Sequence, residues 1–147
     1  RGPEDAPDLP MLEVEVRLDK PEPMLRQKVE EALQGRAVRL ARVNVRLNGV
    51  PNAEVHAGDL YSAVQGRAFD HIVCNPPLRA GRAVVDRIVS DAPRFLLDGG
   101  QLWLVARTRQ GADSLRRRMI LAFGNAEIVN RGSGYKVLRA TKEARAG

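Results

Sequence analysis

The chain has 147 residues, of which 44% are hydrophobic, so it can build a packed core and is too apolar for a disordered protein. No apolar run reaches the roughly 18 residues that a membrane-spanning helix needs, and the N-terminus shows no apolar signal-peptide region. The 24 lysines and arginines against 18 acidic residues give a formal charge of +6, which raises the expectation of a polyanionic partner without establishing one. We therefore expect a soluble, cytoplasmic protein with no membrane partner. The lone Cys74 excludes an internal disulfide, and two histidines are too few to suggest a metal site.

The first third of the chain predicts one strand followed by two helices. Residues 1–10 contain three prolines and predict a lead-in without regular structure. Apolar and charged residues alternate strictly over 12–19, which predicts a half-buried strand that ends at the prolines just after it. Helical spacing then predicts one helix that stops at Gly35 and a second over about 36–47, before a turn at Asn48-Gly49.

The rest of the chain alternates between strand and helix patterns. Pro93 should shorten the helix after the second of these strands, and Asp113 or Ser114 can cap the helix after the third. In chain order, the expected elements are a short strand at 53–56, a buried strand at 69–74, an amphipathic helix at 83–97, a turn at 98–100, a strand at 102–105, a helix ending at Phe123, and two strands near 127–130 and 135–139.

This alternation predicts an α/β fold with a mainly parallel sheet. The last two strands must be antiparallel neighbours, because only a short glycine-containing turn joins them. We expect a single domain over 11–142, with 1–10 as a lead-in and 143–147 as a tail. Trp103 is expected in the core, which argues against base stacking across an open sheet.

The segment that says most about chemistry is Asn75-Pro76-Pro77-Leu78, directly after the buried strand. In an open α/β sheet, ligands bind beyond the carboxyl ends of the strands. The Asn75 oxygen and the Pro76 carbonyl could both accept hydrogen bonds from an exocyclic amine and direct its lone pair at an electrophilic methyl group. The simpler alternative is a turn that ends the strand, since Asn-Pro is ordinary turn chemistry.

Asp70-x-Ile72-Val73-x-Asn75-Pro76-Pro77 resembles motif IV of amino-methyltransferases, and the run that continues to Gly81 is similar to the small-domain methyltransferases related to ribosomal RNA guanine-N2 methyltransferases. Matches in the family's order cover 36–142. They include Gly99-Gly100-x-Leu102-Trp103-x-Val105, Gln110-Gly111-Ala112-x-Ser114, Phe123-Gly124-Asn125-Ala126-Glu127 and Gly134-Tyr135-Lys136-Val137-Leu138. The resemblance implies a Rossmann-like methyltransferase sheet, S-adenosylmethionine as cofactor, and guanine N2 of ribosomal RNA as the acceptor. Because motif IV alone does not distinguish the acceptor, a DNA or protein amine is the weaker alternative.

The resemblance also assigns roles to individual residues. Asn75, Pro76 and Pro77 become the clamp for the target amine, and Leu78 takes a position that is often aromatic in the family. The loop that contacts the cofactor adenine is matched by Asp59 and Leu60. Four arginines become candidates for RNA binding, although single arginines are more often simply solvated. They are Arg79, Arg82, Arg107 and Arg109.

The family's glycine-rich cofactor loop is missing. Before Asn48 the only glycines are Gly2 and Gly35, and neither follows a strand closely enough to serve. The fold is therefore expected to lack part of its N-terminal half. Three explanations stay open: a segment is absent from the chain, the cofactor site has been lost, or a second copy or partner chain completes the fold. In the second case the chain would be a catalytically inactive relative that binds RNA or a ribonucleoprotein.

Basic side chains form further groups that could contact RNA. Each group alone is best explained as solvated surface, but beside an RNA-modifying resemblance they favour an RNA footprint. The groups are a helical stripe of Arg36, Arg39, Arg42 and Arg46, the run Arg116-Arg117-Arg118, and the C-terminal Arg139, Lys142 and Arg145.

Overall fold

The computed structural model describes residues 23–76 and 81–144. These residues divide into two compact units, the first ending at Gln65 and the second beginning at Gly66. Within the described ranges, no helix combines the length and the apolarity needed to cross a bilayer. The strand expected over 12–19 lies outside the described residues.

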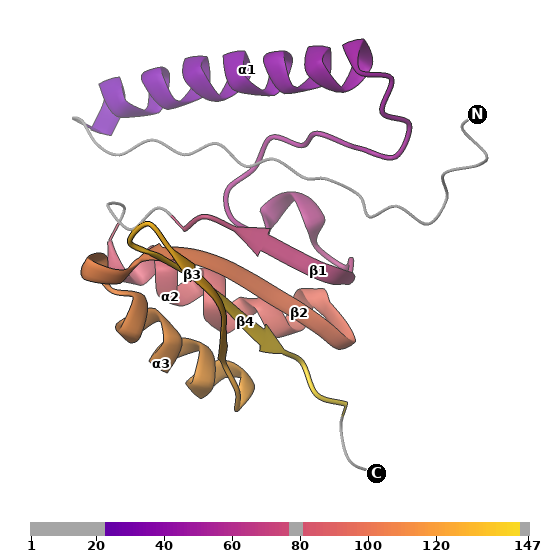
Figure 1. Ribbon diagram of the computed structural model, residues 1–147. Helices are drawn as coiled ribbons and strands as arrows, with labels where there is room; N and C mark the ends of the chain where they lie inside the picture. The colour runs from indigo at the N-terminus through magenta and orange to yellow at the C-terminus, as the bar shows by residue number, and fades with distance from the viewer. Residues whose placement is uncertain (1–22, 77–80, 145–147) are drawn as a thin grey trace. The chain divides into compact units, whose positions relative to one another are not determined.

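The first unit contains one long helix, α1 (Pro23–Leu47), which runs without a break (Figure 1). The expected break at Gly35 is wrong. A glycine keeps its backbone N–H and costs only about 1 kcal/mol relative to alanine inside a helix, so the helical segments on either side continue through it. The expected turn at Asn48-Gly49 is confirmed, because Gly49 has φ +60° and its N–H donates to the Arg46 oxygen at 3.1 Å.

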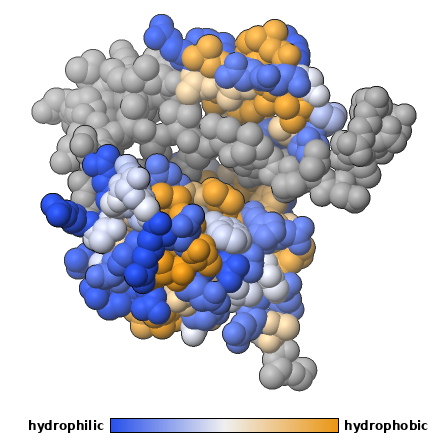
Figure 2. All heavy atoms as spheres, viewed as in Figure 1, coloured by the Kyte–Doolittle hydropathy of each residue, from blue (hydrophilic) through white to orange (hydrophobic). Residues whose placement is uncertain are grey.

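The C-terminal half of α1 presents a mixed surface to solvent. Figure 2 shows hydrophobic side chains interspersed with hydrophilic ones along this helix. The exposed arginines, at the spacing that the predicted stripe requires, are Arg36, Arg39, Arg42 and Arg46. The exposed apolar side chains beside them are Leu40, Val43 and Leu47.

The short strand expected at 53–56 is wrong, since these residues belong to no strand. A strand needs a hydrogen-bonded neighbour, which alternation over four residues cannot supply. Here a side chain satisfies the backbone instead: Arg42 Nη2 donates to the Val55 oxygen at 3.2 Å, and the Val55 side chain is buried. The unit ends with a short 3-10 helix, η2 (Ser62–Val64).

The second unit is built on a four-stranded sheet. Its strands are β1 (Phe69–Cys74), β2 (Leu96–Arg107), β3 (Glu127–Gly132) and β4 (Tyr135–Thr141), in the spatial order β1-β2-β4-β3. Strand β1 runs parallel to β2, and β4 runs antiparallel to both β2 and β3. The predicted α/β fold with a C-terminal antiparallel hairpin is confirmed.

Two helices follow the strands where the sequence predicts them. Helix α2 (Arg82–Asp91) passes into the 3-10 helix η4 (Ala92–Phe95), so Pro93 shortens the predicted helix as expected. Helix α3 (Ala112–Phe123) follows β2 after a 3-10 turn, η5 (Thr108–Gln110).

The cap expected for α3 is wrong. Its N-cap residue is Gly111, with φ +102°, and no side chain caps the helix. The Asp113 carboxylate instead accepts a hydrogen bond from Lys136 Nζ at 3.3 Å. A glycine is suited to this position because a positive φ is costly for residues with a Cβ atom.

The turn expected at 98–100 is also wrong, because these residues lie inside β2 as a strand irregularity. The pairing with β1 jumps from Phe69–Leu96 to His71–Gln101. The backbone there is held by the end of the chain: Gly99 N–H donates to the Lys142 oxygen at 2.7 Å, and Lys142 N–H donates to the Gly100 oxygen at 2.8 Å. These partners lie more than 40 residues away in sequence, so local pattern could not reveal them.

The core of the second unit lies between one face of the sheet and helices α2 and α3, which cover the same side (Figure 1). The largest fully buried side chains come from both layers: Val85, Val89, Leu96, Leu102, Leu104, Leu115, Met119 and Leu138. Because side chains alternate along a strand, Trp103 points to the opposite face from Leu102 and Leu104.

Trp103 is half-buried, so the prediction that it belongs to the core is wrong. Its indole N–H donates to His71 Nδ1 on β1 at 3.2 Å. On the other side, the Arg139 guanidinium lies 5.3 Å from the ring centroid. Trp103 therefore has polar neighbours on both flanking strands.

Candidate active site

Residues from three strands of the second unit end or begin at one edge of the sheet. Strands β1 and β2 are parallel, with Cys74 paired to Leu104, so their carboxyl ends lie together. Strand β4 is antiparallel to β2 and begins at this edge, where Tyr135 pairs with Arg107. This is the edge at which open α/β sheets bind ligands.

The predicted amine clamp begins at this edge. Asn75, the first residue after β1, is exposed, and the following Pro76 is buried. Proline cannot donate to a strand ladder, so the sequence ends β1 here and leaves Asn75 beside the end of β2. Pro77, Leu78 and Arg79, also predicted at the site, lie outside the described residues.

Arg107 is the last residue of β2 and makes two contacts with Tyr135. Its Nε donates to the tyrosine Oη at 3.0 Å, and its guanidinium carbon lies 5.4 Å from the ring centroid. Both residues are exposed. The sequence pattern makes Arg107 a candidate for RNA binding and places Tyr135 in a run that matches the family, but it assigns Tyr135 no role. Only the pairing of β2 with β4 brings these two residues together.

The hairpin between β3 and β4 is held to the same edge. Its two loop residues, Ser133 and Gly134, have φ +50° and +82°, which is the pattern of a tight type I′ turn. The Gly134 oxygen accepts a hydrogen bond from Thr108 N–H at 2.8 Å, directly after β2 ends. The turn is therefore fixed relative to Arg107.

Two more predicted RNA-binding arginines are described. Arg82 is the first residue of α2, seven residues after Asn75 in the sequence, whereas Arg109 lies in η5, two residues after Arg107. Both are exposed. The described residues of the clamp, Asn75 and Pro76, and the three arginines that the resemblance assigns to RNA, Arg82, Arg107 and Arg109, thus lie at the carboxyl ends of β1 and β2 or in the segments that follow them.

The predicted cofactor residues Asp59 and Leu60 belong to the first unit. They form a closed loop in which Asp59 N–H donates to Ser62 Oγ at 2.8 Å and Ser62 N–H donates to the Asp59 oxygen at 3.0 Å. Leu60 has φ +53°, a left-handed conformation that is uncommon for a residue other than glycine and is often found at functional sites. At Gly58 a Cβ atom would lie 2.9 Å from Ala63 Cβ, so this position requires glycine.

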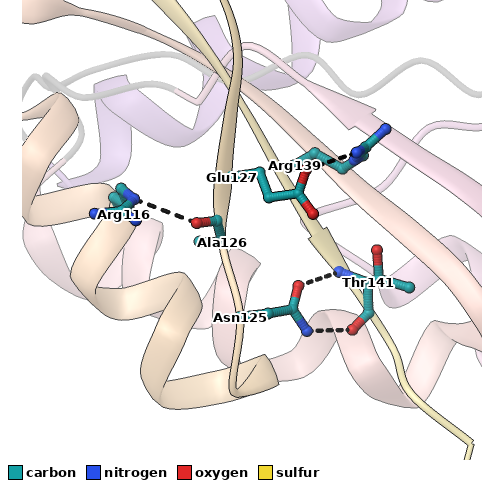
Figure 3. A network of polar contacts seen from close by, with 6 residues as sticks. All are labelled: Arg116, Asn125, Ala126, Glu127, Arg139 and Thr141. Carbon is teal, nitrogen blue, oxygen red and sulfur yellow. Dashed lines mark hydrogen bonds and ion pairs between the residues drawn. The ribbon is translucent and has the colours of Figure 1, made fainter.

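Several of the other basic residues have partners within the fold. Figure 3 shows Arg116 Nε donating to the Ala126 oxygen at 3.3 Å, and Arg139 Nη2 paired with Glu127 Oε2 at 2.7 Å. Arg118 Nε pairs with the Asp86 carboxylate on α2 at 2.7 Å. These side chains support the packing of the second unit, which makes them weaker candidates for RNA contact than the arginines at the carboxyl edge.

The family model described as methyltransferase small domain matches residues 17–139, most of the chain. The chain belongs to the methyltransferase small domain family. The resemblance drawn from Asn75-Pro76-Pro77 and the runs after it is confirmed, and so is the Rossmann-like methyltransferase fold.

Relatives of this small-domain chain include ribosomal RNA methyltransferases. The protein YbxB of Bacillus subtilis is 35% identical over 108 residues, which are 73% of this chain and 54% of YbxB. Ribosomal RNA large subunit methyltransferase G of Streptomyces avermitilis is 35% identical over 119 residues, which are 78% of this chain and 30% of that enzyme. The chain therefore spans about half or less of the length of these relatives.

Solved methyltransferases share the fold. The T. thermophilus 16S rRNA N2 G1207 methyltransferase (RsmC), in complex with AdoMet and guanosine, matches with a TM-score of 0.56 and 25% identity, over 69% of this chain and 27% of that one. A methyltransferase from Pyrococcus furiosus matches with a TM-score of 0.59 and 20% identity, over 73% of this chain and 58% of its own. The family is dependent on S-adenosylmethionine, as the resemblance implied.

Proposed function

We propose that this chain takes part in S-adenosylmethionine-dependent methyl transfer to an exocyclic base amine in RNA, with guanine N2 of ribosomal RNA as the acceptor. The observation that carries the proposal is the position of Asn75 and Pro76 at the carboxyl end of β1, beside the parallel end of β2. The choice of acceptor is supported by relatives named as methyltransferases of large- and small-subunit ribosomal RNA, and by the neighbour named for N2 of a guanosine.

The clamp needs acceptors rather than a strong base. The side-chain oxygen of Asn75 and the backbone oxygen of Pro76 accept the two N–H groups of the amine, which orients the nitrogen lone pair toward the methyl group. Bound S-adenosylmethionine would supply the methyl group, so that an N–C bond would form as the sulfonium S–C bond broke and left a thioether. The cationic nitrogen then loses a proton to water. Pro77 and Leu78 complete the proposed clamp.

The loop of Gly58, Asp59 and Leu60 is proposed to hold the adenine of the donor. The Asp59 carboxylate can accept a hydrogen bond from the adenine amine, and the two hydrogen bonds between Asp59 and Ser62 support the loop. These residues fit the adenine end of S-adenosylmethionine.

RNA binding is proposed for the arginines near the clamp. Arg82, Arg107 and Arg109 are exposed close to the carboxyl ends of the strands, where they can neutralise phosphates on either side of the target base. Arg79 is proposed for the same role from its place in the sequence. A protein that acts on ribosomal RNA in this way is expected in the cytoplasm.

The test combines donor binding with methyl transfer. Calorimetric titration of the chain with S-adenosylmethionine should give micromolar binding, and radiolabelled donor should transfer methyl groups to guanine-containing RNA. Asn75→Ala should abolish transfer while leaving donor affinity unchanged. Equal transfer by this variant would overturn the clamp. A chain that binds RNA but no donor up to millimolar concentration would contradict the proposal and favour an RNA-binding relative without activity.

A further inference from the structure

Arg107 and Tyr135 form an exposed cation–aromatic pair at the edge of the sheet that carries the clamp. Arginine guanidinium groups lie over four aromatic rings in the described part of the chain, and the tyrosine is the most exposed of these rings. The ring of Phe95, for comparison, is only 3% exposed, whereas Tyr135 is 38% exposed. A pair that serves packing alone does not need to leave its aromatic residue open to solvent.

The pair is also held in place before any ligand binds. The Arg107 Nε–Tyr135 Oη hydrogen bond of 3.0 Å joins the two side chains, and the Thr108–Gly134 hydrogen bond fixes the turn before Tyr135. A surface that is already ordered loses less conformational freedom on binding, so more of the interaction energy appears as affinity.

The register places this pair within reach of the clamp. Strands β1, β2 and β4 are adjacent, and Cys74 pairs with Leu104 whereas Tyr135 pairs with Arg107. Tyr135 therefore lies two strand spacings across the sheet and three residues along it from the end of β1, a separation of roughly 14 Å. A few nucleotides of single-stranded RNA can bridge this distance while one base occupies the clamp.

From these observations we infer that Tyr135 and Arg107 form a stacking platform for a base that flanks the target nucleotide in RNA. The inference rests on the proposed function. The tyrosine ring offers a flat surface to any base, and the guanidinium adds its planar cation and its attraction for phosphate. Arg109 in η5, just after β2, and Arg131 in β3, just before the hairpin turn, are both exposed and add positive charge suited to the RNA backbone.

RNA fits this chemistry better than a folded protein partner does. Among the described residues, the carboxylate of Asp113 is paired with Lys136 Nζ at 3.3 Å, and no acidic side chain lies within ion-pair distance of Arg107, Arg109 or Arg131. Single-stranded nucleic acid is bound by this combination of aromatic rings and a positively charged groove.

The experiment measures the affinity of the full chain for fluorescein-labelled, single-stranded oligoribonucleotides with one central guanine. Tyr135→Ala should weaken binding about tenfold through the loss of one base stack, and Tyr135→Phe should keep nearly all of the affinity. Arg107→Ala should weaken binding and lower the slope of log affinity against log salt by about 0.7. Arg94→Ala is the matched control, because Arg94 also covers an aromatic ring but lies before β2, at the opposite end of that strand.

A coupling measurement separates stacking from a general effect on the fold. An abasic nucleotide is placed in turn at each position that flanks the guanine. In the wild-type chain, one such position should weaken binding about tenfold, and in Tyr135→Ala the same position should have no further effect. If each abasic substitution changes the affinity of the wild-type chain and of Tyr135→Ala by the same factor, the platform does not exist.

The two proposals fail in different ways. Methylation of guanine by the wild type, lost in Asn75→Ala, without coupling at Tyr135 would leave the proposed function intact and overturn the platform. Coupling at Tyr135 without any methyl transfer would support the platform and contradict the proposed function. A chain that binds none of these RNAs would overturn both.

Discussion

Asn125 binds the backbone of Thr141 through two hydrogen bonds of 2.8 Å each, one to its N–H and one to its carbonyl (Figure 3). The side-chain amide therefore pairs with the end of β4 as the peptide group of a neighbouring strand would. Asn125 lies between α3 and β3, so this contact ties that connection to β4, which lies between β2 and β3 in the sheet. It secures the hairpin at the end farthest from Tyr135.

Asn125→Ala should destabilise the fold by about 1–3 kcal/mol, because both backbone groups of the partly buried Thr141 lose their partner. Urea unfolding followed by circular dichroism measures the difference. Asn130→Ala is the control, since the Asn130 side chain accepts a hydrogen bond from Arg131 N–H at an exposed position. Equal unfolding midpoints for the two variants would show that the Asn125 contact contributes no more to stability than the exposed Asn130 contact does.

Gly100→Ala should also destabilise the protein, by about 1–3 kcal/mol, because a methyl group cannot be accommodated there. An added Cβ would lie 2.8 Å from the Leu97 oxygen and 3.0 Å from the Phe69 oxygen, both backbone atoms that cannot move without disturbing the sheet. The comparison is Gly132→Ala, where no atom lies within 4 Å of the added group. Thermal unfolding should separate them clearly, and a Gly100→Ala variant as stable as Gly132→Ala would contradict the packing described for the β2 irregularity.

Gly35→Ala should have the opposite sign and stabilise the chain by about 0.5–1 kcal/mol, because alanine loses less conformational freedom than glycine in a helix. The position lies within α1, and no atom comes within 4 Å of an added Cβ. Helix content at 222 nm and the unfolding midpoint should both rise. A decrease would mean that α1 is interrupted at this residue, as the sequence pattern had suggested.

Local signals in the sequence predicted the elements that depend on neighbouring residues. The apolar run of β1, the shortening of α2 by Pro93 and the glycine-containing turn of the hairpin all carry their causes within a few residues. The errors arose where distant residues decide the outcome. The irregularity in β2 is held by Lys142, and the Asp113 carboxylate is bound by Lys136 instead of capping its helix.

The candidate site likewise contains residues that local sequence identifies and residues that only strand pairing brings together. Asn75 and Pro76 could be recognised because the end of a buried strand and a proline step are visible in the sequence. The partnership of Arg107 and Tyr135 could not, because 28 residues separate them and only the antiparallel register of β2 and β4 makes them neighbours. Residues that become neighbours through strand pairing are therefore the ones that a local sequence pattern does not reveal.

The clamp and the donor loop should give opposite kinetic signatures when each is changed. Asn75→Ala removes an acceptor that positions the amine for attack, so the turnover rate should fall about 100-fold or more while the Kd for S-adenosylmethionine stays unchanged. Asp59→Ala removes a contact to the part of the donor that does not react. It should therefore raise the Kd and KM for the donor about tenfold and leave kcat nearly constant.

Calorimetry and initial-rate measurements on the two variants, side by side, distinguish these effects. Asp59→Asn is the matched control for the loop, because its amide oxygen can still accept the adenine hydrogen bond while the charge is lost. Retained donor affinity in Asp59→Asn with lost affinity in Asp59→Ala would support a hydrogen bond to adenine. If Asn75→Ala instead weakens donor binding and Asp59→Ala slows turnover, the two assignments are reversed, and the amine would have to be positioned by residues other than Asn75.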